Sequence, residues 1–159
     1  MLKKILFIGA FSTLFAGCAS VPTSTDHNAV QQLKLFPSPA EGQAGLYLYR
    51  SNSVVGASLK KDIWVDGNCI GETARGIFFY TEVMGGQEHE IATESEFSPN
   101  IIKLNTEFGK NYFIQQYIKP GAIVGGANLK VVDESTGKAE VQKLQLAEKG
   151  TCSKELKKS

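Results

Sequence analysis

The stretch IWVDGNCIG, from Ile63 to Gly71, decides the fold of this chain. At its centre, Asp66-Gly67 is a dipeptide that favours a two-residue hairpin turn, because both turn positions need a positive φ. The apolar run before this turn predicts one strand, and the run after it predicts the antiparallel partner strand. A β-hairpin is therefore the first element that the sequence indicates.

Strand-like runs recur on both sides of this hairpin, and each ends in a turn marked by Gly, Pro, Asn or Ser. They cover residues 45–50, 76–83, 88–93, 101–104, 111–118 and 128–132. Short strands at such intervals predict an all-β domain, namely a small antiparallel β-sandwich of about seven to eight strands.

One short helix and a final strand are predicted after residue 132. Asp133 or Ser135 can cap the helix, because both side chains accept hydrogen bonds from free amides at a helix N-terminus. Gly137 argues against a long helix at this place. With these elements the β domain extends over residues 45–147.

Alternation along the strands assigns their faces. Leu46 and Leu48 lie on one face of the first strand, whereas Tyr47 and Tyr49 lie on the other. The strand 76–83 is apolar on both faces, which predicts a central strand that is covered on both sides. In the alternative, one aromatic face is left open for a ligand.

The N-terminus has the pattern of an export signal. A basic start, Met1 to Lys4, precedes an uncharged apolar run over 5–15. This run is too short to cross a bilayer, which needs about 20 apolar residues. Leu14 to Cys18 then resembles the bacterial lipobox, in which small residues precede a Cys that is lipidated and becomes the mature N-terminus. We predict a signal peptide over 1–17 and a lipid on Cys18.

The predicted lipid anchors the protein to a membrane. The resemblance to bacterial lipoproteins implies more than one acyl chain, and a single chain would bind only marginally. Ala19 and Ser20 follow the Cys, with no Asp beside the lipid. By resemblance to the sorting rule of two-membrane bacteria, this favours the outer membrane, with the domain facing the periplasm.

The segment 18–44 is polar and rich in Ser, Thr and Pro, which predicts a flexible tether. One stretch within it, Val30 to Phe36, has apolar spacing that could form a helical turn docked on the domain. After the β domain, residues 148–159 form a C-terminal tail.

Charge and cysteine content narrow the classes of function. The chain has 17 basic and 16 acidic residues, so it offers no electrostatic footprint for nucleic acid. Cys69 and Cys152 remain after cleavage, and an exported protein keeps disulfides, so we predict that they pair. In the alternative, Cys69 is a small buried apolar residue and Cys152 lies on a free tail.

No catalytic, metal or cofactor motif stands out. The two histidines, His27 and His89, are far apart in the sequence and lack the spacing of metal ligands. No Gly-x-Ser-x-Gly motif is present, and the residues after Asp66 lack the oxygen ligands of a calcium loop. We expect no catalytic residue, no metal and no cofactor.

Two loops, residues 53–57 and 122–126, carry β-branched residues at positions where turns are commonly polar. If both loops lie at one end of the sandwich, they form an apolar patch suited to a partner or to a membrane surface. In the alternative, they fold back over the core. Arg50, which follows two tyrosines in the same strand, is a further candidate contact. In the alternative, it is a structural charge at the end of that strand. The candidate binding residues are Tyr49, Arg50, Val54, Val55, Ile123 and Val124.

The strand and turn motifs together resemble a known family. The series comprises LYLYR (46–50), IWVDG (63–67), GIFFY (76–80), GGQEHEI (85–91) and GKNYF (109–113). It is similar to small bacterial lipoproteins with the domain of unknown function twenty-eight forty-six and, more distantly, to surface-layer β domains named for a Pro-Glu-Gly-Ala motif. The resemblance implies a small periplasmic β-sandwich and carries no established activity.

These observations favour a non-enzymatic binding or structural module of the cell envelope, with an envelope protein or a glycan as its partner. A carrier that holds a lipid or another small apolar ligand between its sheets is the second hypothesis. An envelope hydrolase built from residues distant in the sequence is the third. The carrier needs a cavity, whereas the module needs only a surface patch.

Overall fold

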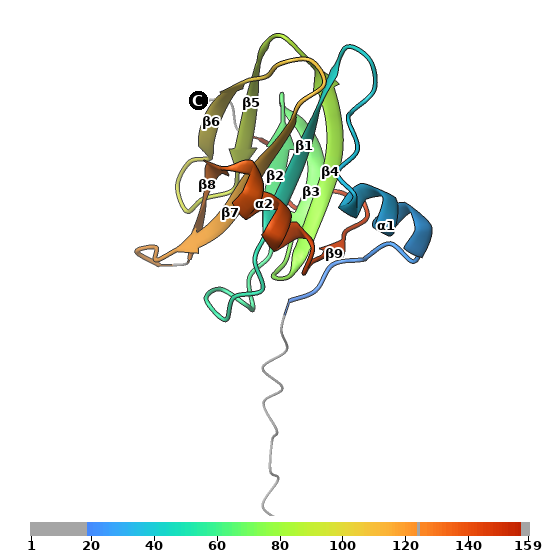
Figure 1. Cartoon of the computed structure of the whole chain (residues 1–159). Coiled ribbons are helices and arrows are strands. Elements are labelled where there is room, and N and C mark those ends of the chain that lie inside the picture. The colour runs from blue at the N-terminus through green and yellow to red at the C-terminus, as the bar shows by residue number, and fades with distance from the viewer. Residues whose placement is uncertain (1–18, 124, 157–159) are drawn as a thin grey trace, which may run out of the picture.

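The computed structural model describes residues 19–123 and 125–156. These residues form two β-sheets packed face to face, with two short helices (Figure 1). The predicted signal peptide, Cys18, Val124 and residues 157–159 lie outside the described residues. In the described part, no helix is long and apolar enough to cross a membrane.

The elements follow the predicted order. They are α1 (His27–Lys34), β1 (Gln43–Arg50), β2 (Lys61–Val65), β3 (Asn68–Thr73), β4 (Ile77–Met84), β5 (Glu88–Thr93), β6 (Asn100–Asn105), β7 (Asn111–Lys119), β8 (Gly126–Val132), α2 (Glu134–Val141) and β9 (Gln145–Leu146). The first sheet has the order β8-β7-β1-β4-β9, and the second has the order β3-β2-β5-β6. The predicted β-sandwich is therefore confirmed. The predicted final strand is present as β9, with only two residues, and the sandwich differs from the predicted antiparallel one in the parallel pairing of β1 with β7 and of β4 with β9.

The hairpin that the sequence indicates joins β2 and β3. Asp66 has φ 50° and Gly67 has φ 77°, as a two-residue turn of this type requires. The Asp66 carboxylate also accepts a hydrogen bond from the Glu90 amide at 2.9 Å. The turn is thus tied to the neighbouring strand β5.

The main core lies between the two sheets. Leu46, Leu48 and Phe79 from the first sheet meet Ile63 and Ile91 from the second, and each is at most 1% exposed. Burial of a side chain of this size contributes about 1.5–3 kcal/mol. The predicted alternation in β1 is confirmed, and it points the leucines toward the second sheet and the tyrosines away from it.

A chain of polar side chains also joins the sheets. Gln116 of β7 is fully buried and donates from Nε2 to Thr93 Oγ1 at 2.8 Å. Its Oε1 accepts a hydrogen bond from Thr73. Because a buried amide without partners would be costly, these contacts fix the register of one sheet on the other.

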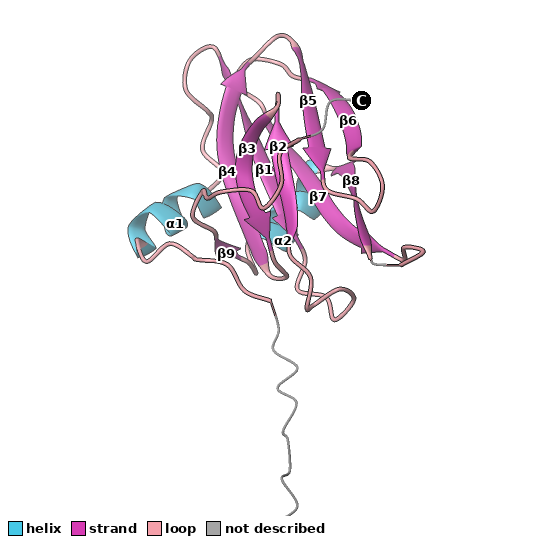
Figure 2. Cartoon of the chain, turned by 180° about the vertical axis from the view of Figure 1, so that it is seen from behind, coloured by secondary structure: helices cyan, strands magenta, loops and turns pink. Residues whose placement is uncertain are grey.

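A second, aromatic core covers the outer face of the first sheet. Tyr47, Phe78 and Phe113 are at most 1% exposed, and the rings of Tyr47 and Phe113 stack with centroids 5.0 Å apart. Helix α2 packs on this face, and Figure 2 shows both helices on the far side of the sandwich. The prediction that the strand 76–83 is a central strand covered on both sides is confirmed for β4, whose Phe79 packs between the sheets and whose Phe78 packs in the aromatic core.

Helix α2 begins as predicted. Asp133 is its N-cap and accepts a hydrogen bond from the Thr136 amide at 2.9 Å. Gly137 faces the sheet, and a Cβ there would lie only 2.2 Å from Phe113 Cγ. The glycine thus permits the close approach of α2 to β7.

The prediction of a flexible tether over 18–44 is wrong for its described part. Thr23 forms a β-bridge with Ala147, and the Ser24 amide donates to the Leu146 carbonyl at 2.8 Å. The Tyr47 hydroxyl donates to the Leu33 carbonyl at 2.9 Å. Phe36 packs into the aromatic core, so docking of this segment buries apolar surface that a tether would expose. The helical turn within it is confirmed as α1.

Candidate functional site

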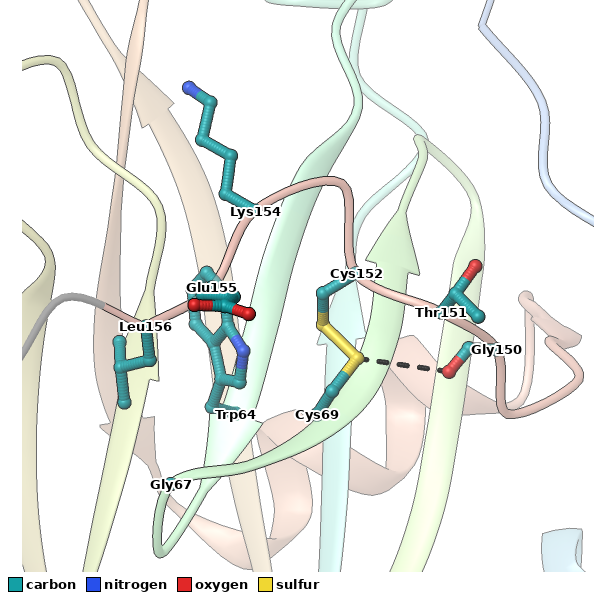
Figure 3. A pocket seen from close by; sticks show the side chains of 9 residues that line it. All are labelled: Trp64, Gly67, Cys69, Gly150, Thr151, Cys152, Lys154, Glu155 and Leu156. Atoms are coloured by element: carbon teal, nitrogen blue, oxygen red, sulfur yellow. Dashed lines mark hydrogen bonds between the residues drawn. A yellow bond between two sulfur atoms is a disulfide. The ribbon is translucent and has the colours of Figure 1, made fainter.

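The outer face of the second sheet is crossed by residues 150–156, which we call the C-terminal strap. The predicted disulfide is confirmed: Cys69 of β3 and Cys152 of the strap have an S–S distance of 1.99 Å and a Cα–Cα distance of 5.9 Å. The alternative of a free C-terminal tail is therefore wrong for residues up to 156. The strap lies directly over β2 and β3 (Figure 3).

Two carboxylates fasten the strap beyond the disulfide. Asp62 is fully buried and accepts hydrogen bonds from the amides of Ser153 at 3.0 Å and Lys154 at 2.9 Å. Glu94 accepts from Lys154 Nζ at 2.6 Å and lies 3.5 Å from Lys61 Nζ. Burial raises the pKa of Glu94, but both lysines outweigh this effect and leave the pKa below its ordinary value.

Two clefts flank the strap, and Trp64 lies at the base of both. The first has a volume of about 540 Å³ and runs from the disulfide to Gly67, with Thr151 and Glu155 on its wall (Figure 3). The second has a volume of about 500 Å³ and lies between Lys154 and the loop 94–99. Because the strap covers only part of the sheet, concave surface remains on either side of it.

Phe97, in the loop that borders the second cleft, is 81% exposed. A large aromatic side chain in water is the type of residue that dominates recognition surfaces. Phe97 was not among the residues predicted from the sequence, because the surrounding Ser, Glu and Pro indicate an ordinary loop. The available signal was one aromatic residue within that polar run.

The two apolar loops singled out in the sequence lie at the same end of the sandwich. Val54 and Val55 are 82% and 60% exposed, and Ile123 is 84% exposed. Val124 lies outside the described residues. The three described side chains do not fold back over the core, so the apolar patch is the arrangement that the structure supports.

Ile118 of β7 packs against both of these loops. A Cβ at Gly56 would lie 2.5 Å from Ile118 Cγ1, and a Cβ at Gly125 would lie 3.2 Å from Ile118 Cγ2. Glu96 accepts hydrogen bonds from the amides of Ala122 and Ile123 and so holds the second loop from its other side. The patch therefore rests on ordered backbone.

Tyr49 and Arg50 are not surface contacts, which corrects their candidacy as binding residues. They are 1% and 3% exposed. The Arg50 guanidinium donates to the carbonyls of Leu59, at 2.8 Å, and Gly56, and thereby shapes the loop that carries Val54 and Val55. Burial lowers the pKa of Arg50 to about 10, so it stays charged at neutral pH. Burial also raises the pKa of Tyr49 to about 12.

Both ring nitrogens of His89 lie within hydrogen-bond distance of an oxygen atom. Its Nδ1 lies 2.6 Å from Asp66 Oδ2, and its Nε2 lies 2.7 Å from the Met84 carbonyl oxygen. The ring is 3% exposed, so it ties the Asp66 turn to the end of β4 and offers no nitrogen to a substrate. Within the described residues, no group of three His, Cys, Asp or Glu side chains is placed to hold a metal ion.

The fold and the clefts define a small β-sandwich with a disulfide-tied strap. Residues 40–127, more than half of the chain, match the family described as Protein of unknown function (DUF2846), and the chain belongs to this family. It is also similar to an uncharacterized protein of Haemophilus influenzae, with 48% identity over 134 residues that cover 84% of this chain and 78% of that protein. No solved structure matches.

Proposed function

We propose that this protein is a lipid-anchored module of the cell envelope that binds a partner and does not catalyse a reaction. The observation that carries the binding role is the pair of clefts beside Trp64, together with the exposed ring of Phe97. A rigid sheet with one exposed aromatic anchor and adjacent concave surface suits recognition, since a few such residues supply most of the contact energy.

The partner is an envelope protein or a glycan, both of which are bound through aromatic side chains and nearby polar groups. Lys154 and Glu155 supply those polar groups at both clefts. The apolar loops around Val54 and Ile123 are less suited to a large partner, because they lie at the end of the domain that adjoins the anchor.

The membrane attachment in this proposal rests on the lipobox that ends at Cys18. The absence of Asp after Cys18 favours the outer membrane of a two-membrane bacterium, with the domain in the periplasm. The Ala19 amide donates to the Ala57 carbonyl at 3.0 Å, so the folded domain begins next to the proposed lipid.

The other two hypotheses receive less support. A carrier needs space between the sheets, where Leu48, Phe79 and Ile91 pack together. A hydrolase needs an accessible base, and the two ring nitrogens of His89 are held by Asp66 and by the Met84 carbonyl. Recognition at an outer face requires neither feature.

Membrane attachment is tested with Cys18→Ala. We expect this variant to leave the membrane fraction or to accumulate as uncleaved precursor, because the acyl chains have no other attachment site. Membrane fractionation and intact mass measure both effects. Unchanged mass and unchanged fractionation would show that another feature holds the protein.

Partner binding is tested with a photo-crosslinking amino acid at Thr151, in the first cleft, introduced into otherwise wild-type protein and into the Phe97→Ala variant. We expect a discrete crosslink in intact cells that Phe97→Ala weakens. Phe108→Ala is the matched control, because Phe108 is 64% exposed and lies outside both clefts. A crosslink unaffected by Phe97→Ala, or the absence of any crosslink, would contradict the proposed surface.

A further inference from the structure

The loop that carries Val54 is connected to the start of the described chain through consecutive backbone hydrogen bonds. The Ala19 amide donates to the Ala57 carbonyl at 3.0 Å, and the Ala57 amide donates to the Val54 carbonyl at 3.2 Å. Ala19 directly follows Cys18 in the sequence. The described chain therefore begins one residue after the proposed lipid site, and it begins beside the loop that carries Val54.

The second loop lies at the same end because β7 runs parallel to β1. The pairing of Gly45 with Asn111 through Tyr49 with Gln115 brings the ends of both strands together. The loops that follow β1 and β7 therefore lie toward the same end of the sandwich. Figure 1 shows the β1–β2 loop beside the point where the described chain begins and the β7–β8 loop projecting to the side.

The three side chains at this end are aliphatic and face water. Val54 and Ile123, at 82% and 84%, are the most exposed of the large apolar residues described, and Val55 is 60% exposed. Aliphatic side chains in water gain free energy on entering an apolar phase. A lipid that enters the bilayer from Cys18 brings such a phase to this end of the domain.

We propose that Val54, Val55 and Ile123 insert into the interfacial layer of the membrane that holds the Cys18 lipid. This inference rests on the proposed lipid anchor. It adds a second contact between the domain and the membrane, and two contacts fix the orientation of the domain relative to the bilayer. The patch thus contacts the lipid bilayer itself, because the proposed anchor keeps the bilayer next to this end of the domain.

This contact also orients the partner surface. The loops are held by Arg50, Ile118 and Glu96, so insertion orders little additional backbone. The first cleft reaches Gly67, which lies at the opposite end of β2 from these loops. With the loops in the membrane, the Gly67 end of this cleft lies away from the bilayer.

The test uses full-length lipidated protein in vesicles of phosphatidylethanolamine and phosphatidylglycerol whose acyl chains carry bromine near the headgroup. Ile123→Trp places a fluorophore in the patch. Met84→Trp is the control, because Met84 is 52% exposed and lies at the end of β4 that is farther from the loop after β1. Wild-type protein supplies the background, since Trp64 is the only native tryptophan.

We expect bromine to remove roughly half of the added emission from Ile123→Trp and little from Met84→Trp, because interfacial side chains lie about 5–10 Å deep. Equal quenching of both, or no quenching while mass spectrometry finds acyl chains on Cys18, would overturn the insertion and leave the anchor intact. No acyl chain on Cys18 would overturn both proposals. A photo-crosslinker at position 123 that captures a protein in cells would assign the patch to a protein partner instead.

Discussion

The two outer faces of the sandwich are covered in different ways. On the first sheet, α2 and Phe36 bury Tyr47 and Phe78 completely, and the cover is held by apolar contact. On the second sheet, a strap of a few residues is held by one disulfide and two carboxylates. The first cover leaves the rings beneath it fully buried, whereas the second leaves two clefts beside it.

This difference separates stability from recognition. An apolar cover is most stable when it leaves no gap, because each gap forfeits burial and packing. A covalent and ionic cover holds its place without filling the surface, so concave space can remain beside it. Of the two outer faces, we therefore expect the first to contribute more to folding stability, and we assign the proposed binding to the second.

The largest effect is expected on the outer face of the first sheet. Phe78→Ala should lower the free energy of unfolding by about 3–5 kcal/mol, because it removes a fully buried ring and leaves a cavity. Urea denaturation measures this loss. Tyr117→Ala in the same sheet is the control, since Tyr117 is 36% exposed. Similar losses for both variants would contradict the role of the aromatic core.

We expect the disulfide to contribute less to the free energy of unfolding than the aromatic core does, but by a measurable amount. The double variant Cys69→Ser and Cys152→Ser should lose about 2–4 kcal/mol, because the bond closes a loop with a sequence separation of 83 residues. Wild-type protein unfolded under reducing conditions should show the same loss. An unchanged urea midpoint would mean that the carboxylates alone hold the strap.

Gly137→Ala tests how closely helix α2 packs on the first sheet. Alanine favours helix by about 1 kcal/mol, but its Cβ would overlap Phe113, and overpacking of this kind costs about 1–3 kcal/mol. We expect net destabilisation. Ala139→Gly, on the exposed side of α2, should lose about 1 kcal/mol through helix propensity alone. A gain in thermal stability for Gly137→Ala would show that α2 moves freely on the sheet.

The smallest effect concerns the ionic fastening of the strap. The pKa of Glu94 is lowered from 4.5, so its stabilising contribution is complete above about that pH and is lost as the pH falls through the lower folded value. Glu94→Gln should cost about 0.5–1 kcal/mol at neutral pH. The difference from wild type should shrink below pH 4.5. A difference that is constant from neutral pH to pH 3 would exclude the ionic origin.

Most of the sandwich could be predicted from local patterns. Asp66-Gly67 has the positive φ values of its hairpin turn, and Asp133 caps the helix expected after it. The parallel pairs of β1 with β7 and of β4 with β9 could not be predicted, because pairing partners far apart in sequence leave no local signal. The predicted final strand is present as β9, although it is only two residues long.

The candidate site was predicted only in part. Exposure of Val54, Val55 and Ile123 follows from their loops, whereas the burial of Arg50 depends on carbonyls that fold over it. The tether was predicted wrongly, because its polar composition concealed the few contacts that dock it, above all Phe36 on the aromatic core. The clefts arise from how the strap crosses the sheet, which composition does not encode.

The proposed attachment of this domain to a membrane through a lipid on Cys18 can be tested directly on intact protein extracted from membranes. Mass spectrometry of the N-terminal peptide should find a chain that begins at Cys18 and carries the mass of more than one acyl chain. A peptide that begins at Met1, or an unmodified Cys18 in membrane-extracted protein, would contradict the account.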